Sequence, residues 1–115
     1  MADIGTTVRV DDVPDLLGAL ILLIAPVRAA RAEPGQRLIG DLGYHSLAMA
    51  ELGFTIEDLF RVESLSPETA MTIERVEDIV QLVGKHVAEG EGNLPEVGEV
   101  DAVFARYGSA WAPGS

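Results

Sequence analysis

The segment from Ser46 to Phe60 constrains the fold more than any other part of the chain. Its apolar residues recur at helical spacing, so at about 100° per residue they gather on one side of a helix. The residues on that side are Ala48, Met49, Leu52, Ile56, Leu59 and Phe60. Gly43, in the loop just before, permits a sharp turn into the helix. The pattern therefore predicts an amphipathic helix that packs one face against a core.

The opposite side of this helix mixes acidic and apolar residues. It carries Leu47, Glu51, Phe54, Glu57 and Asp58. Acids are expected in water, whereas Leu47 and Phe54 beside a solvent-facing Ser46 indicate a docking strip for another protein. The alternative interpretation is that both are ordinary, scattered surface hydrophobes. Ser46, taken alone, is of the residue type that caps a helix.

Three further helices are predicted to complete an all-α, four-helix bundle. The first spans 13–25, and a long loop at 27–44 follows it, pinned by Leu38 and Leu42. A short third helix begins at Pro67 after a cap at Ser66, and the last spans residues 73–85 after a cap at Thr72. About 75 residues of this kind are enough for a single core.

The first predicted helix is more apolar than one core-facing side requires. Its predicted core residues are Val13, Leu16, Leu20, Leu23, Ile24 and Val27. Three further apolar residues of this helix lie outside that stripe, and another element must bury them: Leu17, Ile21 and Leu22. Apolar residues at helical spacing near the carboxyl end predict an additional short helix at 97–107, lying over Leu17 and Ile21. A disordered tail used for docking is the alternative.

The predicted organisation is a flexible leader at 1–10, a folded domain at 11–88, and a linker and tail at 89–115. The last residues, 108–115, are expected to be disordered, although Trp111 is an unusual residue to leave in water.

Composition excludes several classes of function. The net charge of −11 argues against nucleic acid and favours partners with basic surfaces. The absence of cysteine means that any thiol must come from a cofactor. The start of the chain lacks the pattern of a secretory signal, and its most apolar run, 16–27, is too short to cross a bilayer, so a cytoplasmic, membrane-free protein is expected.

A catalytic or metal site is not indicated. His45 and Ser46 are neighbours whose side chains point about 100° apart on a helix, so direct proton transfer between them is strained. His86 is the one other histidine, and the two histidines lack the close spacing of metal ligands.

At Asp41-Leu42-Gly43-Tyr44-His45-Ser46-Leu47 the chain resembles the carrier-protein family, which comprises acyl carrier proteins and the peptidyl carriers of nonribosomal peptide synthesis. The segment fits the family pattern D-L-G-x-D/H-S-L at every defined position. Downstream matches are Glu51, Leu52, Ile56, Glu57 and Phe60, and the resemblance extends from about Asp12 to Val83. His45 stands where acyl carriers usually have aspartate, which leaves open the transferase that acts.

The resemblance implies an acyl-carrier-protein-like four-helix bundle in which 11–88 is the carrier domain. It implies that Ser46 is the attachment site of 4′-phosphopantetheine, transferred from coenzyme A by a phosphopantetheinyl transferase. The chain would then be a non-catalytic, free-standing and monomeric carrier that binds acyl- or aminoacyl-loading enzymes and downstream synthase enzymes. The expected partner-binding residues are His45, Leu47, Glu51, Phe54, Glu57 and Asp58.

Two questions stay open at this level. The acidity of the chain favours a polyketide or fatty-acyl carrier, whereas His45 favours a peptidyl carrier. We expect a role in specialised-metabolite synthesis, such as that of polyketide or nonribosomal peptide antibiotics. The alternative is an unmodified carrier-like domain that acts only as a protein-interaction scaffold.

Overall fold

Four α-helices and one short 3-10 helix shape the described part of the chain, which in this computed structural model comprises residues 7–27, 32–62 and 72–111. The elements are η1 (Val10–Asp12), α1 (Val13–Ile24), α2 (Ser46–Phe60), α4 (Val76–Ala88) and α5 (Val97–Arg106). The all-α fold and the extra C-terminal helix are confirmed. The third helix predicted after Ser66 lies in 63–71, outside the described residues.

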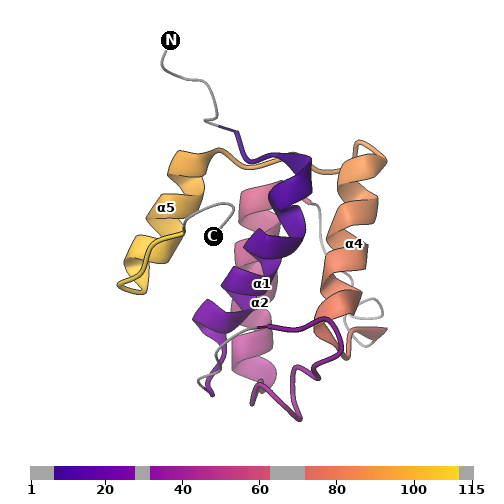
Figure 1. Ribbon diagram of the computed structural model, residues 1–115, viewed down its shortest axis with the longest axis vertical. Helices are drawn as coiled ribbons and strands as arrows, with labels where there is room; N and C mark the ends of the chain where they lie inside the picture. Colours follow the sequence, from indigo (N-terminus) through magenta and orange to yellow (C-terminus); the bar gives the residue numbers. More distant parts are fainter. Residues whose placement is uncertain (1–6, 28–31, 63–71, 112–115) are drawn as a thin grey trace.

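The helices lie in a simple order in space (Figure 1). α1 and α2 occupy the middle, with α4 to one side of them and α5 to the other. α1 and α5 run from the top of this view to the bottom, whereas α2 and α4 run upward. The amino end of α2 therefore lies at the lower end, beside the loop that follows α1.

α1 is buried on two faces rather than one. Leu17 and Ile21, expected outside the core stripe, are fully buried, because α1 lies between elements on both sides. Leu23 is half-buried and packs against the core, whereas Val27 is 48% exposed, so the predicted core position of Val27 was wrong. Val27 lies beyond Pro26, which cannot continue a helix, and so it never shares the helical face.

The loop before α2 is held at both sides. Leu38 and Leu42 are buried as expected. The backbone N–H of Leu38 donates to the carbonyl of Glu74 (3.0 Å), and that of Val76 donates to the carbonyl of Gln36 (3.0 Å). This pairing keeps the residues before Val76 extended, and α4 therefore begins there rather than at Ile73 after a cap at Thr72.

The amino end of α4 is capped by Asp78. One of its carboxylate oxygens accepts from the backbone N–H groups of Glu74 and Arg75, at 2.9 Å each. These two bonds lower the pKa of Asp78. A depressed folded-state pKa means that the carboxylate stabilises the fold above its unfolded-state pKa, and that this contribution is lost as the pH falls through the folded-state value.

We expect Asp78→Ala to lower the free energy of unfolding by about 1 kcal/mol at neutral pH, the usual cost of a lost cap. Glu77→Ala is the matched control: it removes the same charge from the same turn, and should cost less than about 0.5 kcal/mol. Urea unfolding measures both. The difference between the variants should shrink on acidification; a difference that stayed constant with pH would contradict the charged cap.

The amino-terminal segment and the segment just before α5 are hydrogen-bonded to other parts of the chain. The backbone N–H of Val8 donates to Pro95 O (2.8 Å), and Asn93 N–H donates to Phe60 O (2.6 Å). Val8 is 2% exposed. Residues 7–10 and 93–95 therefore differ from the loose leader and linker that we expected; residues 1–6 lie outside the described part.

α5 contributes to the same core as the other helices. Val100, Val103 and Phe104 are buried, and Trp111 joins them at 9% exposure. The expectation of disorder from residue 108 was therefore wrong as far as Trp111, because its indole fills part of the core. Residues 112–115 lie outside the described part.

Candidate site at the amino end of α2

Ser46 is the first residue of α2 and is exposed. The cap is His45, not Ser46: its backbone is extended (φ −132°, ψ −179°) and its Nδ1 accepts from the Ala48 N–H at 3.3 Å. The capping role considered for Ser46 is therefore wrong, because the residue with the non-helical backbone is the one before it. Among the described residues the Ser46 hydroxyl has no hydrogen-bond partner.

The turn before Ser46 depends on Gly43. Its φ of +75° lies in the left-handed region that favours glycine. A Cβ at this position would lie 2.3 Å from Val27 Cγ2, well inside van der Waals contact. The turn therefore needs both the conformational freedom and the missing side chain.

Tyr44 anchors the same loop from the inside. Its ring is buried, and its hydroxyl donates to the carbonyl of Ile21 at 2.6 Å. Burial, with a smaller effect of the nearby Glu51 charge, raises the pKa of Tyr44. Tyr44 stands at the undefined position of the motif, and no role was predicted for it from the sequence. Its aromatic ring in a glycine-containing loop was the available signal, since a buried tyrosine needs a partner for its hydroxyl.

We expect Gly43→Ala to lower the free energy of unfolding by about 2 kcal/mol or more, from left-handed strain and overpacking together. Gly53→Ala is a control with the opposite sign. Gly53 lies inside α2 with no atom within 4 Å of an added Cβ, so alanine should stabilise by up to about 1 kcal/mol. Urea unfolding compares the two. Adding Val27→Ala to Gly43→Ala should recover part of the loss; no recovery would contradict the steric cause.

Leu47 and Phe54 stand out from the surface, at 74% and 70% exposure. Asp58 and His45 are exposed as well, and Glu57 is half-buried. The expected partner-binding residues thus run along the outside of α2 from its amino end. That they bind partners stays a prediction.

Glu51 differs from the other acids on this strip, because it already has a partner within the chain. Its carboxylate accepts from the hydroxyl of Tyr107, which follows α5. Burial, and then the hydrogen bond to Glu51, raise the pKa of Tyr107 to about 12. This contact could not be predicted from the sequence, since no local pattern relates residues 56 positions apart.

Arg106, the last residue of α5, also reaches the strip. It lines a surface hollow together with Phe54, Thr55, Glu57 and Asp58. At the other end of the helix pair, Arg61 forms an ion pair with Glu99 at 3.0 Å. α5 therefore runs antiparallel along one flank of α2, with its carboxyl end nearest the half that begins at Ser46.

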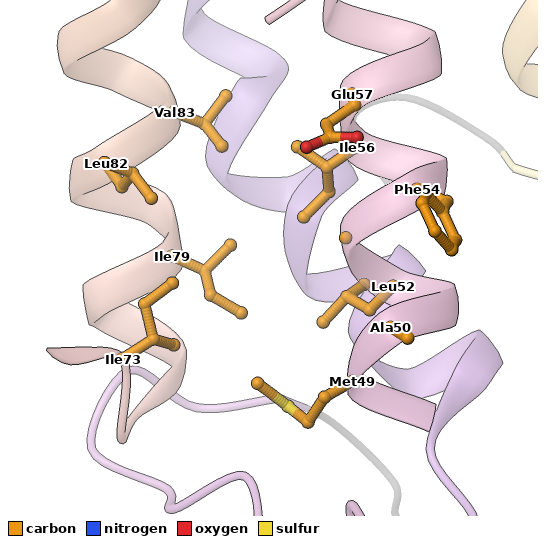
Figure 2. A pocket seen from close by; sticks show the side chains of 11 residues that line it. Met49, Ala50, Leu52, Phe54, Ile56, Glu57, Ile73, Ile79, Leu82 and Val83 are labelled. Carbon is orange, nitrogen blue, oxygen red and sulfur yellow. The ribbon is translucent and has the colours of Figure 1, made fainter. Parts of the chain in front are cut away.

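A second, apolar cavity of about 230 Å³ lies between α2 and α4. Figure 2 shows Met49, Leu52 and Ile56 pointing into it from α2, opposite Ile79 and Val83 of α4, whereas Phe54 points away. Ala50 and Gly53 also line it. This cavity can admit an apolar group of modest size.

The two histidines lie far from each other. His86 contacts Glu91 at 3.1 Å near the end of α4, whereas His45 lies at the beginning of α2, at the opposite end of the molecule in Figure 1. Within the described residues, no group of three His, Cys, Asp or Glu side chains could hold a metal ion. Nor does that part of the chain contain a helix of the length and apolarity needed to span a membrane.

The chain is similar to a known protein. A curated protein named acyl carrier protein, from Solidesulfovibrio magneticus, is 36% identical to this chain over 63 residues, which are 55% of this chain and 80% of the relative. No protein-family model matches the chain. No solved structure matches it either.

Proposed function

Because the chain belongs to the acyl carrier protein family, we propose that the Ser46 hydroxyl carries a 4′-phosphopantetheine arm on which biosynthetic intermediates are held as thioesters. Proteins of this family are non-catalytic carriers that normally bear this group. The observation that carries the proposal is the exposed, unbonded Ser46 hydroxyl at the start of α2.

The amino end of α2 suits a phosphate. The ring nitrogen of His45 accepts a hydrogen bond from the N–H of Ala48, and its carbonyl oxygen accepts one from the N–H of Met49. The N–H groups of Ser46 and Leu47 come before the first intrahelical bonds and have no acceptor among the described residues. With the helix dipole, they favour negative charge at this point. A phosphodiester on Ser46 would therefore be tolerated.

The arm supplies a thiol, which this cysteine-free chain lacks. The chain's own residues present the arm: Gly43 and Tyr44 fix the loop, and α2 holds Ser46 at the surface. Tethering raises the effective concentration of an intermediate near each enzyme in turn. The cavity between α2 and α4 would offer an apolar acyl group a place out of water.

The finer assignment is a carrier domain at 11–88 that serves polyketide or nonribosomal peptide synthesis in the cytoplasm. Its partners would be a phosphopantetheinyl transferase, an acyl- or aminoacyl-loading enzyme and synthase enzymes, met through the exposed strip of α2. The net charge of −11 supports partners with basic surfaces, whose encounter it would steer. His45 before the serine supports the peptidyl branch and the acidity supports the acyl branch.

The test is the intact mass of the full chain after coexpression with a broad-specificity phosphopantetheinyl transferase. We expect the mass to rise by one phosphopantetheine group. The competing function is an unmodified scaffold, which the exposure of Leu47 and Phe54 would also suit. It predicts an unchanged mass with several transferases and a partner contact that Ser46→Ala does not alter. Expression in a native-like host would then show cargo as additional mass.

A further inference from the structure

Three of the large apolar side chains that are exposed in the described part of the chain lie on one face: Leu47 (74%), Phe54 (70%) and Tyr107 (40%). Leu47 and Phe54 belong to α2, and Glu51 lies between them on the same side. Tyr107 follows α5 and is fixed to that face by its hydrogen bond to Glu51. Exposed apolar side chains gathered in this way mark a surface that binds another protein.

The charges beside these side chains are of both signs. Asp58 and Arg106 line the same hollow as Phe54. Neither forms a hydrogen bond or an ion pair within the described residues, and so both are available to a partner. The charge of Glu51, by contrast, is already engaged by Tyr107. The end of α5 thus adds a positive charge beside the acidic strip on α2, so that the surface there carries charges of both signs.

The position of this face relative to Ser46 identifies its occupant. A standard interface covers roughly 800 Å² of each partner, a patch roughly 30 Å across. Phe54 lies eight residues along α2 from Ser46, or about 12 Å at 1.5 Å per residue. An enzyme that reacts at Ser46 with an interface of ordinary size will therefore cover Phe54 and the end of α5 beside it.

We propose that the transferase that modifies Ser46 docks across α2 and the carboxyl end of α5, placing an apolar patch on Leu47, Phe54 and Tyr107, a basic group at Asp58 and a carboxylate at Arg106. This inference rests on the proposed function. According to this proposal, α5 forms part of the recognition surface. The positive charge of Arg106 discriminates against partners whose docking surface is uniformly basic.

The test compares two charge reversals in the full chain. Arg106→Glu and Arg9→Glu change the net charge equally, so long-range steering changes equally. Arg9 is exposed and precedes η1, near the amino end of α5. With a broad-specificity transferase and coenzyme A, we expect Arg106→Glu to slow modification of Ser46 about tenfold relative to Arg9→Glu. Arg106→Gln, which adds no acid at the end of α5, should slow it by about threefold.

A second measurement maps the contact. Amide chemical shifts of the Ser46→Ala chain, titrated with the transferase, should change in 54–58 and in 106–107 together. Equal rates for the two reversals, a faster rate for Arg106→Glu, or shifts confined to α2 would overturn the inference while leaving the carrier function intact. If wild type gains no mass, the carrier function itself fails, and this inference fails with it. Fluorescence of Trp111, the one tryptophan in the sequence, reports whether each variant keeps α5 in place.

Discussion

A chain with alanine in place of Ser46 is expected to gain no phosphopantetheine, and to unfold within about 0.5 kcal/mol of wild type. The loss of modification is complete because the hydroxyl oxygen is the atom that would bond to phosphorus. The stability is kept because Ser46 is exposed, has no hydrogen-bond partner in the described structure, and occupies a helical position where alanine is at least as favourable as serine. Intact mass and urea unfolding give the two readings.

His45→Ala is the informative counterpart. It removes the ring nitrogen that accepts from Ala48 N–H, so it should cost about 1 kcal/mol, the usual value of an N-cap. Ser46→Ala and His45→Ala thus separate the proposed attachment residue from the capping residue next to it. If Ser46→Ala were the costlier of the two, Ser46 would be the cap after all.

Another hydroxyl on α2 provides the control for modification. Thr55 donates to the carbonyl of Glu51 at 2.8 Å, within the helix. Thr55→Ala should therefore be modified like wild type. Phosphopantetheine that persisted in Ser46→Ala would place the attachment elsewhere and would defeat the assignment to Ser46.

Local pattern was sufficient to predict the helices of the described part, but it did not predict every helix end or cap. The apolar spacing from Ala48 to Phe60 predicted α2 with its observed bounds, because one amphipathic face determines one helix. The start of α4 was wrong because Leu38 and Val76 take part in a backbone pairing between distant segments. The cap of α2 was wrong because capping depends on backbone conformation, which His45 and Ser46 do not reveal by residue type.

The side chains that lie beside the predicted strip on α2 could not be predicted, for the same physical reason. Leu47 and Phe54 could be identified as exposed apolar residues from helical projection alone. Tyr107 and Arg106 could not, because their place beside Glu51 and Phe54 follows from the packing of α5 on the bundle. An amphipathic pattern predicts that one face of a helix is buried against a neighbour. The side chains that the neighbouring helix places at the surface depend on how the two helices are aligned along their axes.

Phe104→Ala is expected to lower the free energy of unfolding of the whole chain by about 3–5 kcal/mol, the cost of removing a buried phenyl ring from a core. Phe104 is 3% exposed and belongs to one cluster with α1, α2 and α4. Domains of this kind have total stabilities of about 5–15 kcal/mol, so the variant would approach the limit of folding. Phe54→Ala is the matched control: the same substitution at 70% exposure should cost less than about 1 kcal/mol.

The two probes of this experiment decide whether α5 is part of the fold or an appendage. Far-ultraviolet circular dichroism follows all the helices, and the fluorescence of Trp111 follows the packing beyond α5. Because Val100, Val103 and Phe104 share a core with Leu17 and Ile21, both signals should shift together to lower urea in Phe104→Ala. A shift of the Trp111 signal alone, with the helical transition unchanged, would mean that α5 unfolds by itself. In that case the end of α5 could not provide a fixed wall beside Phe54, and α2 alone would form the docking surface.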